Sequence, residues 1–400
     1  MSGAWQWRRY LLSAMLGMAM SSVDAIAADI HITAEFTPDA NDPNKRTFTN
    51  TTPWSGICTE PGHIENCKSR GIWGIDTTIR GTKSTSGTGE RSYFYFGMPE
   101  PRRLTITDAD GHQRQLTVRV VGMGYRFGYG ESVDVGNGMS NCTVDLTNYG
   151  ANTRSTMRLF RRHDQGQGRS ACWSGRVQGT TGDREIQELD IVYELDAENP
   201  LEMPGGVYTG AIGYSIGGAG ADIDLGDDVQ LDADELTLNF TLTVTHYFGV
   251  RFPPGSARAI LAPLGGWSQW TDHGRAPTAL VKELPFQLSS SSLFGVTLRC
   301  QHAQADGRCA IHHQGNRAPD VPLDIRLTVP GVHDRTLGRE VVEYPLTSTM
   351  NKPLLDPQGY VYERPSRLLF RVDGAPLTEM LTHPGSHYAG DVTVIFDADL

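Results

Sequence analysis

One serine in the chain has the spacing of a catalytic nucleophile. Gly213–Gly217 (GYSIG) matches the G-x-S-x-G elbow of hydrolases, which needs a sharp turn between a strand and a helix. Ser215 instead stands within an alternating apolar segment, and the glycine-rich, acidic stretch after it has no helical pattern. We therefore expect no catalysis by Ser215. Because no paired-carboxylate, phosphate-loop or dinucleotide pattern stands out either, the sequence predicts neither an enzyme nor a cofactor.

Two further groups hold side chains of metal-binding types. Cys300, His302, Cys309, His312 and His313 could form a zinc cluster, but their spacing is not that of a standard finger. An oxidising compartment would favour a disulfide between the two cysteines instead.

The second group is an acidic run of four aspartates between Asp222 and Asp228. A calcium loop starting at Asp222 would need an acidic residue at its twelfth position, where Ala233 stands. A solvated linker is the better interpretation, and no metal site is predicted.

A basic and aromatic group is suited to binding rather than catalysis. It comprises Arg126, Arg154, Arg158, Arg161, Arg162 and Trp173. Because arginine forks grip carboxylates and aromatic faces stack on sugar rings, this group is the candidate surface for a glycan or acidic receptor. The alternative is that these arginines cover ordinary β-surface while the aromatic residues fill the core.

Targeting and charge limit the partners. Arg8 and Arg9, the apolar stretch Leu11–Met20 and the Ala25–Ala27 site (AIA) predict a secretory signal, so we expect a mature chain from Ala28. A signal anchor is the rival interpretation, but the apolar stretch is short for a membrane span. The formal net charge of −11 argues against nucleic acid as a partner.

The six cysteines form three sequence-near pairs. Exported chains with an even cysteine count favour disulfides, although sequence alone allows fifteen pairings. The expected pairs are Cys58 with Cys67, Cys142 with Cys172, and Cys300 with Cys309. The third is best supported, because its flanking segments predict a hairpin around an Ala-Asp-Gly turn.

These residues must be positioned by strands. Forty-five glycines and the absence of any long segment with a 3.6-residue period predict an all-β protein. The motif Pro-Gly-x-x-Tyr-x-Gly, followed by alternating apolar residues, occurs at Pro204–Ile216 and again at Pro384–Phe396. We therefore expect two tandem β-domains, each with this strand late in its sequence.

The two copies of the motif differ in the length of chain on their C-terminal side. Chain remains after the first copy to close its sheet, whereas only four residues come after the second. The second domain is thus expected to be one strand short. An open edge beside an apolar core is an aggregation hazard unless another polypeptide fills it.

Composition sets the expected boundaries. Gly217–Glu235 is rich in glycine and aspartate, so we expect a signal at 1–27, a first domain at 28–217, a linker at 218–235 and a second domain at 236–400. Leu236–His246 then predicts the opening strand of the second domain. Ile30–Phe36 predicts either the first strand of the first domain or an arm donated to a neighbour. Further strands are expected at Ser92–Phe96, Arg103–Thr107, Gln115–Val121, Glu188–Leu195, Phe294–Arg299, Ala310–His313, Leu323–Val329, Arg339–Pro345 and Leu368–Val372.

The second domain resembles a known family. Asn239–Thr245 (NFTLTVT) and His387–Phe396 (HYAGDVTVIF) are similar to segments of pilins of the chaperone–usher pathway, notably the alpha-type, colonisation-factor fimbriae. Preceded by a β-domain that is not a pilin, the whole chain resembles the minor tip adhesin of such fimbriae.

The resemblance implies two immunoglobulin-like β-sandwiches, the second an incomplete pilin fold that lacks its final strand. A periplasmic chaperone would lend that strand, an outer-membrane usher would assemble the fibre, and a major pilin subunit would replace the chaperone strand. The first domain would bind a host or environmental receptor at the fimbrial tip. By resemblance, the groove residues are Tyr388, Gly390, Val392, Val394 and Phe396 on one wall and Phe240, Leu242 and Val244 on the other, with the terminal carboxylate of Leu400 anchored on the chaperone.

Two alternatives stay open. A secreted, self-sufficient β-sandwich, either a carbohydrate-binding protein or a hydrolase accessory, would need no chaperone. An internal shaft subunit would carry Ala28–Phe36 as a free donor arm.

Overall fold

The computed structural model describes residues 27–60, 62–70, 73–127, 141–149, 156–162, 168–173, 182–315 and 318–398. For 70, 127, 144–149 and 156–162 it describes the backbone alone. Three predictions concern residues outside these ranges. They are the secretory signal up to Ile26, the receptor-binding role of Arg154 and the anchoring role of Leu400.

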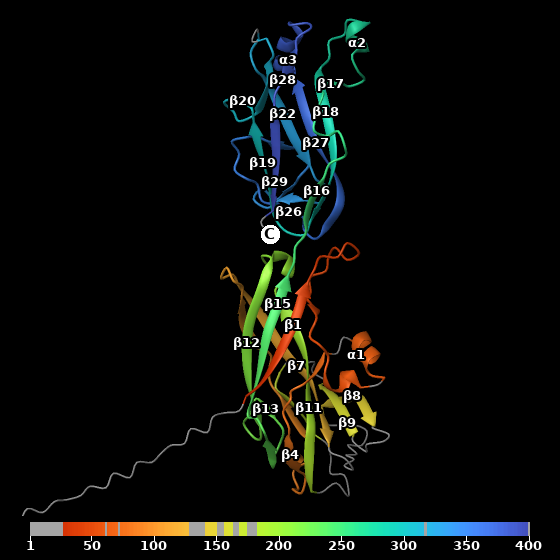
Figure 1. Ribbon diagram of the computed structural model, residues 1–400, viewed down its shortest axis with the longest axis vertical. Coiled ribbons are helices and arrows are strands. Elements are labelled where there is room, and N and C mark those ends of the chain that lie inside the picture. Colours follow the sequence, from red (N-terminus) through yellow and green to blue (C-terminus); the bar gives the residue numbers. More distant parts are fainter. Residues whose placement is uncertain are drawn as a thin grey trace, which may run out of the picture.

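The chain is all-β and forms two β-sandwich domains that lie end to end along the long axis of the molecule (Figure 1). Each domain has its own large hydrophobic core. Among the described residues, the longest helix has only eight residues, and none is long and apolar enough to cross a membrane.

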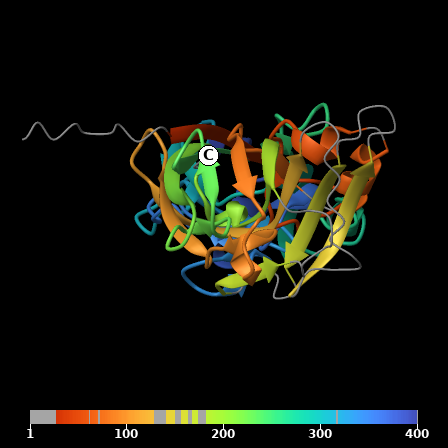
Figure 2. The same ribbon diagram turned by 90° about the horizontal axis from the view of Figure 1, so that it is seen from below.

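The first domain is built from fifteen strands in one curled sheet. They are β1 (Ala27–Phe36), β2 (Thr49–Asn50), β3 (Gly74–Asp76), β4 (Gly81–Ser84), β5 (Tyr95–Met98), β6 (Arg102–Thr107), β7 (Gln113–Phe127), β8 (Cys142–Tyr149), β9 (Thr156–Arg162), β10 (Ser170–Trp173), β11 (Asp183–Ala197), β12 (Gly206–Gly217), β13 (Ile223–Asp224), β14 (Val229–Leu231) and β15 (Glu235–Val244). The helix α1 (Ile64–Arg70) and the hairpin β8–β9 lie together on one side of this domain (Figure 2).

The predicted domain boundary is wrong. β15, expected to open the second domain, lies in the first, where it pairs with β12 in antiparallel and with β1 in parallel orientation. Its apolar face is at most 3% exposed and belongs to the core of the first domain. The first domain therefore extends to Val244. β1 is the first strand of this domain, because its ten residues all pair with β15.

The glycine- and aspartate-rich stretch is not a linker either, because β13 and β14 are strands of the first domain. Arg91 forms ion pairs with Asp224 and Asp227 at 2.7 and 2.8 Å. The ammonium of Lys83 is buried beneath this stretch and donates three hydrogen bonds to main-chain carbonyl oxygens at 2.7 to 2.9 Å. The side chains of Asp224 and Asp227 thus fasten a loop to the domain through Arg91.

The second domain has two facing sheets. Its strands are β16 (Phe248–Arg251), β17 (Ala262–Pro263), β18 (Ala279–Ser290), β19 (Phe294–Cys300), β20 (His302–Ala303), β21 (Cys309–His313), β22 (Val321–Thr328), β23 (His333–Asp334), β24 (Arg339–Glu340), β25 (Tyr344–Leu346), β26 (Leu355–Asp356), β27 (Val361–Asp373), β28 (Tyr388–Ala389) and β29 (Val392–Ala398). Two helices, α2 (Ser268–Thr271) and α3 (Gly374–Leu381), lie at the end far from the first domain (Figure 1).

One sheet of the second domain runs β16-β18-β27-β22, with smaller strands attached, and the other runs β24-β23-β26-β19-β29. The sequence missed β18, the strand between β16 and β27. It also placed one strand at Arg339–Pro345, where the chain forms the separate short strands β24 and β25.

The three expected cysteine pairs are bonded in the structure. Cys58–Cys67, Cys142–Cys172 and Cys300–Cys309 have Cα–Cα separations of 5.8, 5.5 and 5.3 Å. The third bond joins the end of β19 to β21. These two strands were expected to form a hairpin, but β21 pairs with the short strand β20 instead, and β19 belongs to the other sheet.

Candidate functional site

The last strand, β29, forms the edge of its sheet. It pairs with β19 in antiparallel register over its whole length, from Val392 opposite Cys300 to Ala398 opposite Phe294. Among the described residues, no strand pairs with its other side. Its outer main-chain groups therefore face outward, ready to pair with a further strand.

The facing sheet also has an edge here. β16 pairs with β18 and, within the described residues, with no second strand. The second domain thus presents two strand edges, β16 and β29, which belong to opposite sheets. We call the space between them the β16–β29 groove.

Apolar side chains line this groove and are only partly covered. Phe248 and Val250 of β16, and Val392, Val394 and Phe396 of β29, all pack against the core without being fully buried. On the neighbouring strand β19, by contrast, the inward side chains Phe294, Val296 and Leu298 are 0 to 5% exposed. The difference is what an absent strand would leave, because the next strand of a sheet covers the side chains of the one beside it.

Aromatic rings cross the groove at one point. Phe286 of β18 lies 5.4 Å from Phe396 between ring centroids and 5.0 Å from Phe252, which comes directly after β16. Phe252 in turn lies 6.5 Å from Phe396 and is 38% exposed. These rings form an apolar floor that is open to solvent on one side.

In the first domain, the strand with the duplicated motif is covered by a neighbouring strand. In β12, the first copy of the duplicated motif, Tyr208, Tyr214 and Ile216 are at most 4% exposed, and β15 pairs with the strand over ten residues. β15 lies between β12 and β1 (Figure 1). β29 carries the second copy of the motif, and among the described residues it has no partner strand in the position that β15 takes beside β12.

The predicted walls of the groove need correction. Phe240, Leu242 and Val244 are buried in the first domain, so β16 forms the wall assigned to them. Tyr388 and Gly390 precede β29, and Tyr388 lies on β28, which pairs with β21. Val392, Val394 and Phe396 lie on β29, at the edge of the groove.

The predicted receptor group is only partly brought together. Arg126 forms ion pairs with Glu188, at 2.6 Å, and with Glu60, and its side chain is 19% exposed. Burial opposes its charge, but the hydrogen bonds and charges of these two carboxylates raise its pKa above the usual value. Arg126 therefore connects β7 to β11 and to the turn before α1. Its guanidinium group is engaged by these two carboxylates and is not exposed for binding a receptor.

The backbone places the other arginines on one strand. Arg158, Arg161 and Arg162 belong to β9, where Arg158 pairs with Tyr125 of β7 and Arg162 with Cys142 of β8. Trp173 ends β10, which is bonded to β8 through Cys142–Cys172, and it is partly exposed. These residues are thus on neighbouring elements, but Arg126 is not part of an open surface with them.

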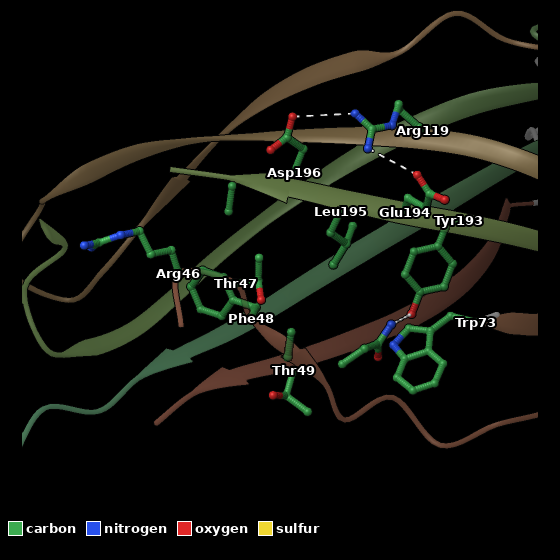
Figure 3. A pocket seen from close by; sticks show the side chains of 13 residues that line it. Arg46, Thr47, Phe48, Thr49, Trp73, Arg119, Tyr193, Glu194, Leu195 and Asp196 are labelled. Carbon is green, nitrogen blue, oxygen red and sulfur yellow. Dashed lines mark hydrogen bonds and ion pairs between the residues drawn. The ribbon is translucent and has the colours of Figure 1, made fainter. Parts of the chain in front are cut away.

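A cavity of about 440 Å³ lies elsewhere in the first domain, and sequence reasoning missed it. Figure 3 shows its aromatic side chains Phe48, Trp73 and Tyr193. It is lined by Ala34, Arg46, Thr47, Phe48, Thr49, Asn50, Trp73, Arg119, Tyr193, Glu194, Leu195, Asp196 and Ala197. No local motif could have indicated it, because its walls come from segments up to about 160 positions apart in sequence.

Charged groups border this cavity. Arg119 is held between Glu194, at 3.2 Å, and Asp196, at 3.5 Å (Figure 3). Its Nε is buried and has no hydrogen-bond partner among the described residues. Asn50 donates a hydrogen bond to the hydroxyl of Tyr193 at 2.7 Å. Aromatic faces beside hydrogen-bonding groups could hold a small polar ligand such as a sugar.

The hydroxyl of Ser215 is occupied by hydrogen bonds with Asp222. Its hydroxyl donates a hydrogen bond to Asp222 at 3.0 Å, and the main-chain N–H of Asp222 donates back to it at 2.9 Å. β12 continues through Ser215 to Gly217 and leads into β13, so the strand–turn–helix geometry of a nucleophile elbow is not formed.

No protein-family model matches the chain, and no curated protein matches it. Several solved structures do. A chain of the chaperone–tip adhesin complex of CFA/I fimbriae is 12% identical, with coverage of 93% of this chain and 96% of that chain, and a TM-score of 0.26. CfaE, the adhesive subunit of the CFA/I fimbria of enterotoxigenic Escherichia coli, is 12% identical over 93% and 92%, also with a TM-score of 0.26.

A chain of the CsuC–CsuE chaperone–tip subunit complex, from archaic Csu pili of Acinetobacter baumannii, is 10% identical over 93% of this chain and 99% of that chain, with a TM-score of 0.24. Scores this low carry no argument about function.

Proposed function

We propose that this protein is the tip adhesin of a surface fibre built by the chaperone–usher pathway. The second domain would accept a strand from another polypeptide in the β16–β29 groove, and the first domain would bind a surface receptor. The observation that carries this proposal is the pair of unpaired strand edges with partly covered apolar side chains between them.

A donated strand would fill the groove between the two edges. Its main chain would pair with β29, and its alternate apolar side chains would cover Val392, Val394 and Phe396. Burial of apolar surface stabilises by about 25 cal/mol per Å², so a strand with five inward apolar residues could contribute several kcal/mol. The partners in this scheme are a periplasmic chaperone, an outer-membrane usher and a major pilin subunit, and the chain would be exported to the fimbrial tip.

The position of β1 supports a tip subunit over a shaft subunit. A shaft subunit would need Ala28–Phe36 as a free arm to donate to its neighbour. Here that segment is paired along its length with β15, and Ile32 and Phe36 are fully buried in the core of the first domain. Releasing it would cost the first domain a strand.

Receptor binding is assigned in this proposal to the first domain. The arginines of β9 with Trp173 remain the candidate surface, because they are on neighbouring elements and arginine and tryptophan suit glycan or acidic ligands. The cavity beside Trp73 and Arg119 is the second candidate position, favoured by its aromatic lining and the unpartnered Nε of Arg119.

Fusion of a complementing strand after Leu400 tests the proposal. The chain itself supplies a donor sequence, because Leu236–Val244 (LTLNFTLTV) already fills the equivalent position in the first domain. A second copy, joined through a short turn, would lie antiparallel to β29. We expect the fusion to convert an aggregation-prone chain into a soluble monomer and to raise the unfolding temperature of the second domain by about 10 °C or more.

The matched control carries the same fusion with aspartate at the two positions that copy Phe240 and Leu242. It should behave like the chain without any fusion, because charged side chains cannot enter the apolar groove. The proposal fails if the unfused chain from Ala28 is a stable monomer that neither fusion changes. That outcome would favour a self-sufficient, secreted carbohydrate-binding or hydrolase-accessory sandwich.

A further inference from the structure

Three side chains of metal-binding types meet at the end of the second domain far from the first. His302 belongs to β20, His312 to β21, and Asp320 directly precedes β22. β20 and β28, which border the group, lie in that far half of the domain (Figure 1). The sequence pattern grouped both histidines with Cys300 and Cys309, but these cysteines are joined to each other and so are not ligands.

Strand register brings the three side chains to one face. His302 pairs with Ala310, so His312, two residues further along β21, is its diagonal neighbour on the same face. Ile311 pairs with Val321, which places Asp320 opposite His312 one step further along. The three side chains thus form a row that runs across β20, β21 and the start of β22.

The distances fit a site for one ion. The imidazole rings of His302 and His312 are stacked, with centroids 5.1 Å apart. Nδ1 of His312 lies 2.5 Å from a carboxylate oxygen of Asp320. One ligand atom of each residue lies within 4.8 Å of the other two. The side chains of His312 and Asp320 are 31% and 35% exposed, so an ion and its remaining waters have access.

The surrounding backbone holds this row in place. The Cys300–Cys309 disulfide closes the hairpin that carries His302. His312 also pairs with Ala389 of β28, and any side chain at Gly390 would meet the main-chain oxygen of Ala310 and the ring of His302. Ligands on paired strands lose little freedom when an ion binds, which favours binding.

We propose that His302, His312 and Asp320 bind one divalent zinc-class cation. Two imidazole nitrogens and one carboxylate oxygen are ligands typical of zinc, whereas calcium and magnesium prefer oxygen alone. Zinc bonds to these atoms are about 2.0–2.2 Å long, so the ligand atoms of a tetrahedral site are about 3.4 Å apart. The nitrogen of His312 and the oxygen of Asp320 must therefore separate slightly to admit the ion, which rotation about their side-chain bonds can supply. The cation would replace the proton between His312 and Asp320, and water would complete its coordination.

Zinc binding to the untagged full chain tests this site, in whichever form is soluble, alone or with a complementing strand. After incubation with zinc chloride and gel filtration, we expect one zinc per chain by elemental analysis, together with a rise in unfolding temperature. Binding should weaken steeply below about pH 6, because protonated imidazoles cannot bind zinc. The result does not depend on the proposed function, since neither the groove nor a receptor contributes a ligand.

Variants make the test specific. His302→Asn with His312→Asn should reduce zinc affinity more than tenfold, and Asp320→Asn should reduce it about tenfold. His387→Asn, at an exposed histidine of the same region, should change nothing. Circular dichroism would check that each variant is folded. Wild-type chain that retains no zinc, or zinc retained equally by the folded double variant, would overturn the proposal.

Discussion

Arg126 shows how far residue types alone can indicate a binding surface. The sequence places it among aromatic residues, which predicted a receptor contact. Its partners Glu188 and Glu60 are 62 and 66 positions away, and no local pattern connects them to it. The same limit applies to Lys83, whose three carbonyl partners are fixed only by the folded loop. The cysteine pairs could be predicted because each pair is near in sequence.

Arg126→Ala is therefore expected to affect stability more than binding. It would leave Glu60 and Glu188 without their cation beside the buried Asp190, whose pKa is already raised well above its usual value, chiefly by burial and also by the charge of Glu188. Because Arg126 is only partly buried, we expect a loss of about 2 kcal/mol in the free energy of unfolding, measured by urea denaturation.

A glycan array separates the two roles of these arginines. Folded Arg126→Ala protein should bind the receptor as the wild type does, whereas Arg158→Ala with Arg161→Ala should lose binding. If Arg126→Ala lost receptor binding without losing stability, Arg126 would instead belong to the receptor-binding surface.

At the scale of elements, alternation identified β15 as a half-buried strand but could not say which sheet contains it. Pairing partners are long-range properties, and the same pattern of leucines fits any sandwich core. β12 and β29 were recognised because their motif is duplicated. β18 was missed, and the glycine- and aspartate-rich stretch was misread because acidic composition does not reveal the arginine that binds it.

The junction between β15 and β16 carries a pH-dependent contact. His246 donates from Nε2 to the carbonyl oxygen of Met203 at 2.8 Å, and its Nδ1 lies 3.1 Å from the hydroxyl of Ser291. The N–H of Tyr247 donates to the same hydroxyl at 2.9 Å, so this oxygen is free to give its proton to His246. Burial lowers the pKa of His246 below its usual value near 6.5, so the folded chain keeps it neutral.

We therefore expect the free energy of unfolding to fall as the pH drops below about 6.5. At that pH His246 takes up a proton in the unfolded chain but stays neutral in the folded chain. Above that pH both states are neutral and the contact is fully present. Thermal unfolding at pH 7.5 and 5.5, with a chelator present, should show a smaller pH effect in His246→Gln than in the wild type. An equal pH effect in both would show that another group is responsible.

At the scale of the whole molecule, the two domains differ in how their sheets are closed. The first fills the position between β1 and β12 with its own strand, and the second leaves the β16–β29 groove uncovered among the described residues. The sequence predicted this open edge from the second copy of the motif, although it assigned one wall of the groove to the wrong domain. The two domains also touch beyond the junction, where Tyr360 donates its N–H to the carbonyl oxygen of Pro43 at 2.9 Å.

Amide hydrogen exchange of β29 tests the open groove most directly. Without a complementing strand, the outward amides of β29 should exchange much faster than those of the central strands β18 and β27. With the fused copy of Leu236–Val244, we expect their exchange to slow by about 100-fold, while the aspartate-bearing control leaves it unchanged. Amides of β29 that are already as protected as those of β18 in the unfused monomer, and that the fusion does not alter, would contradict the account.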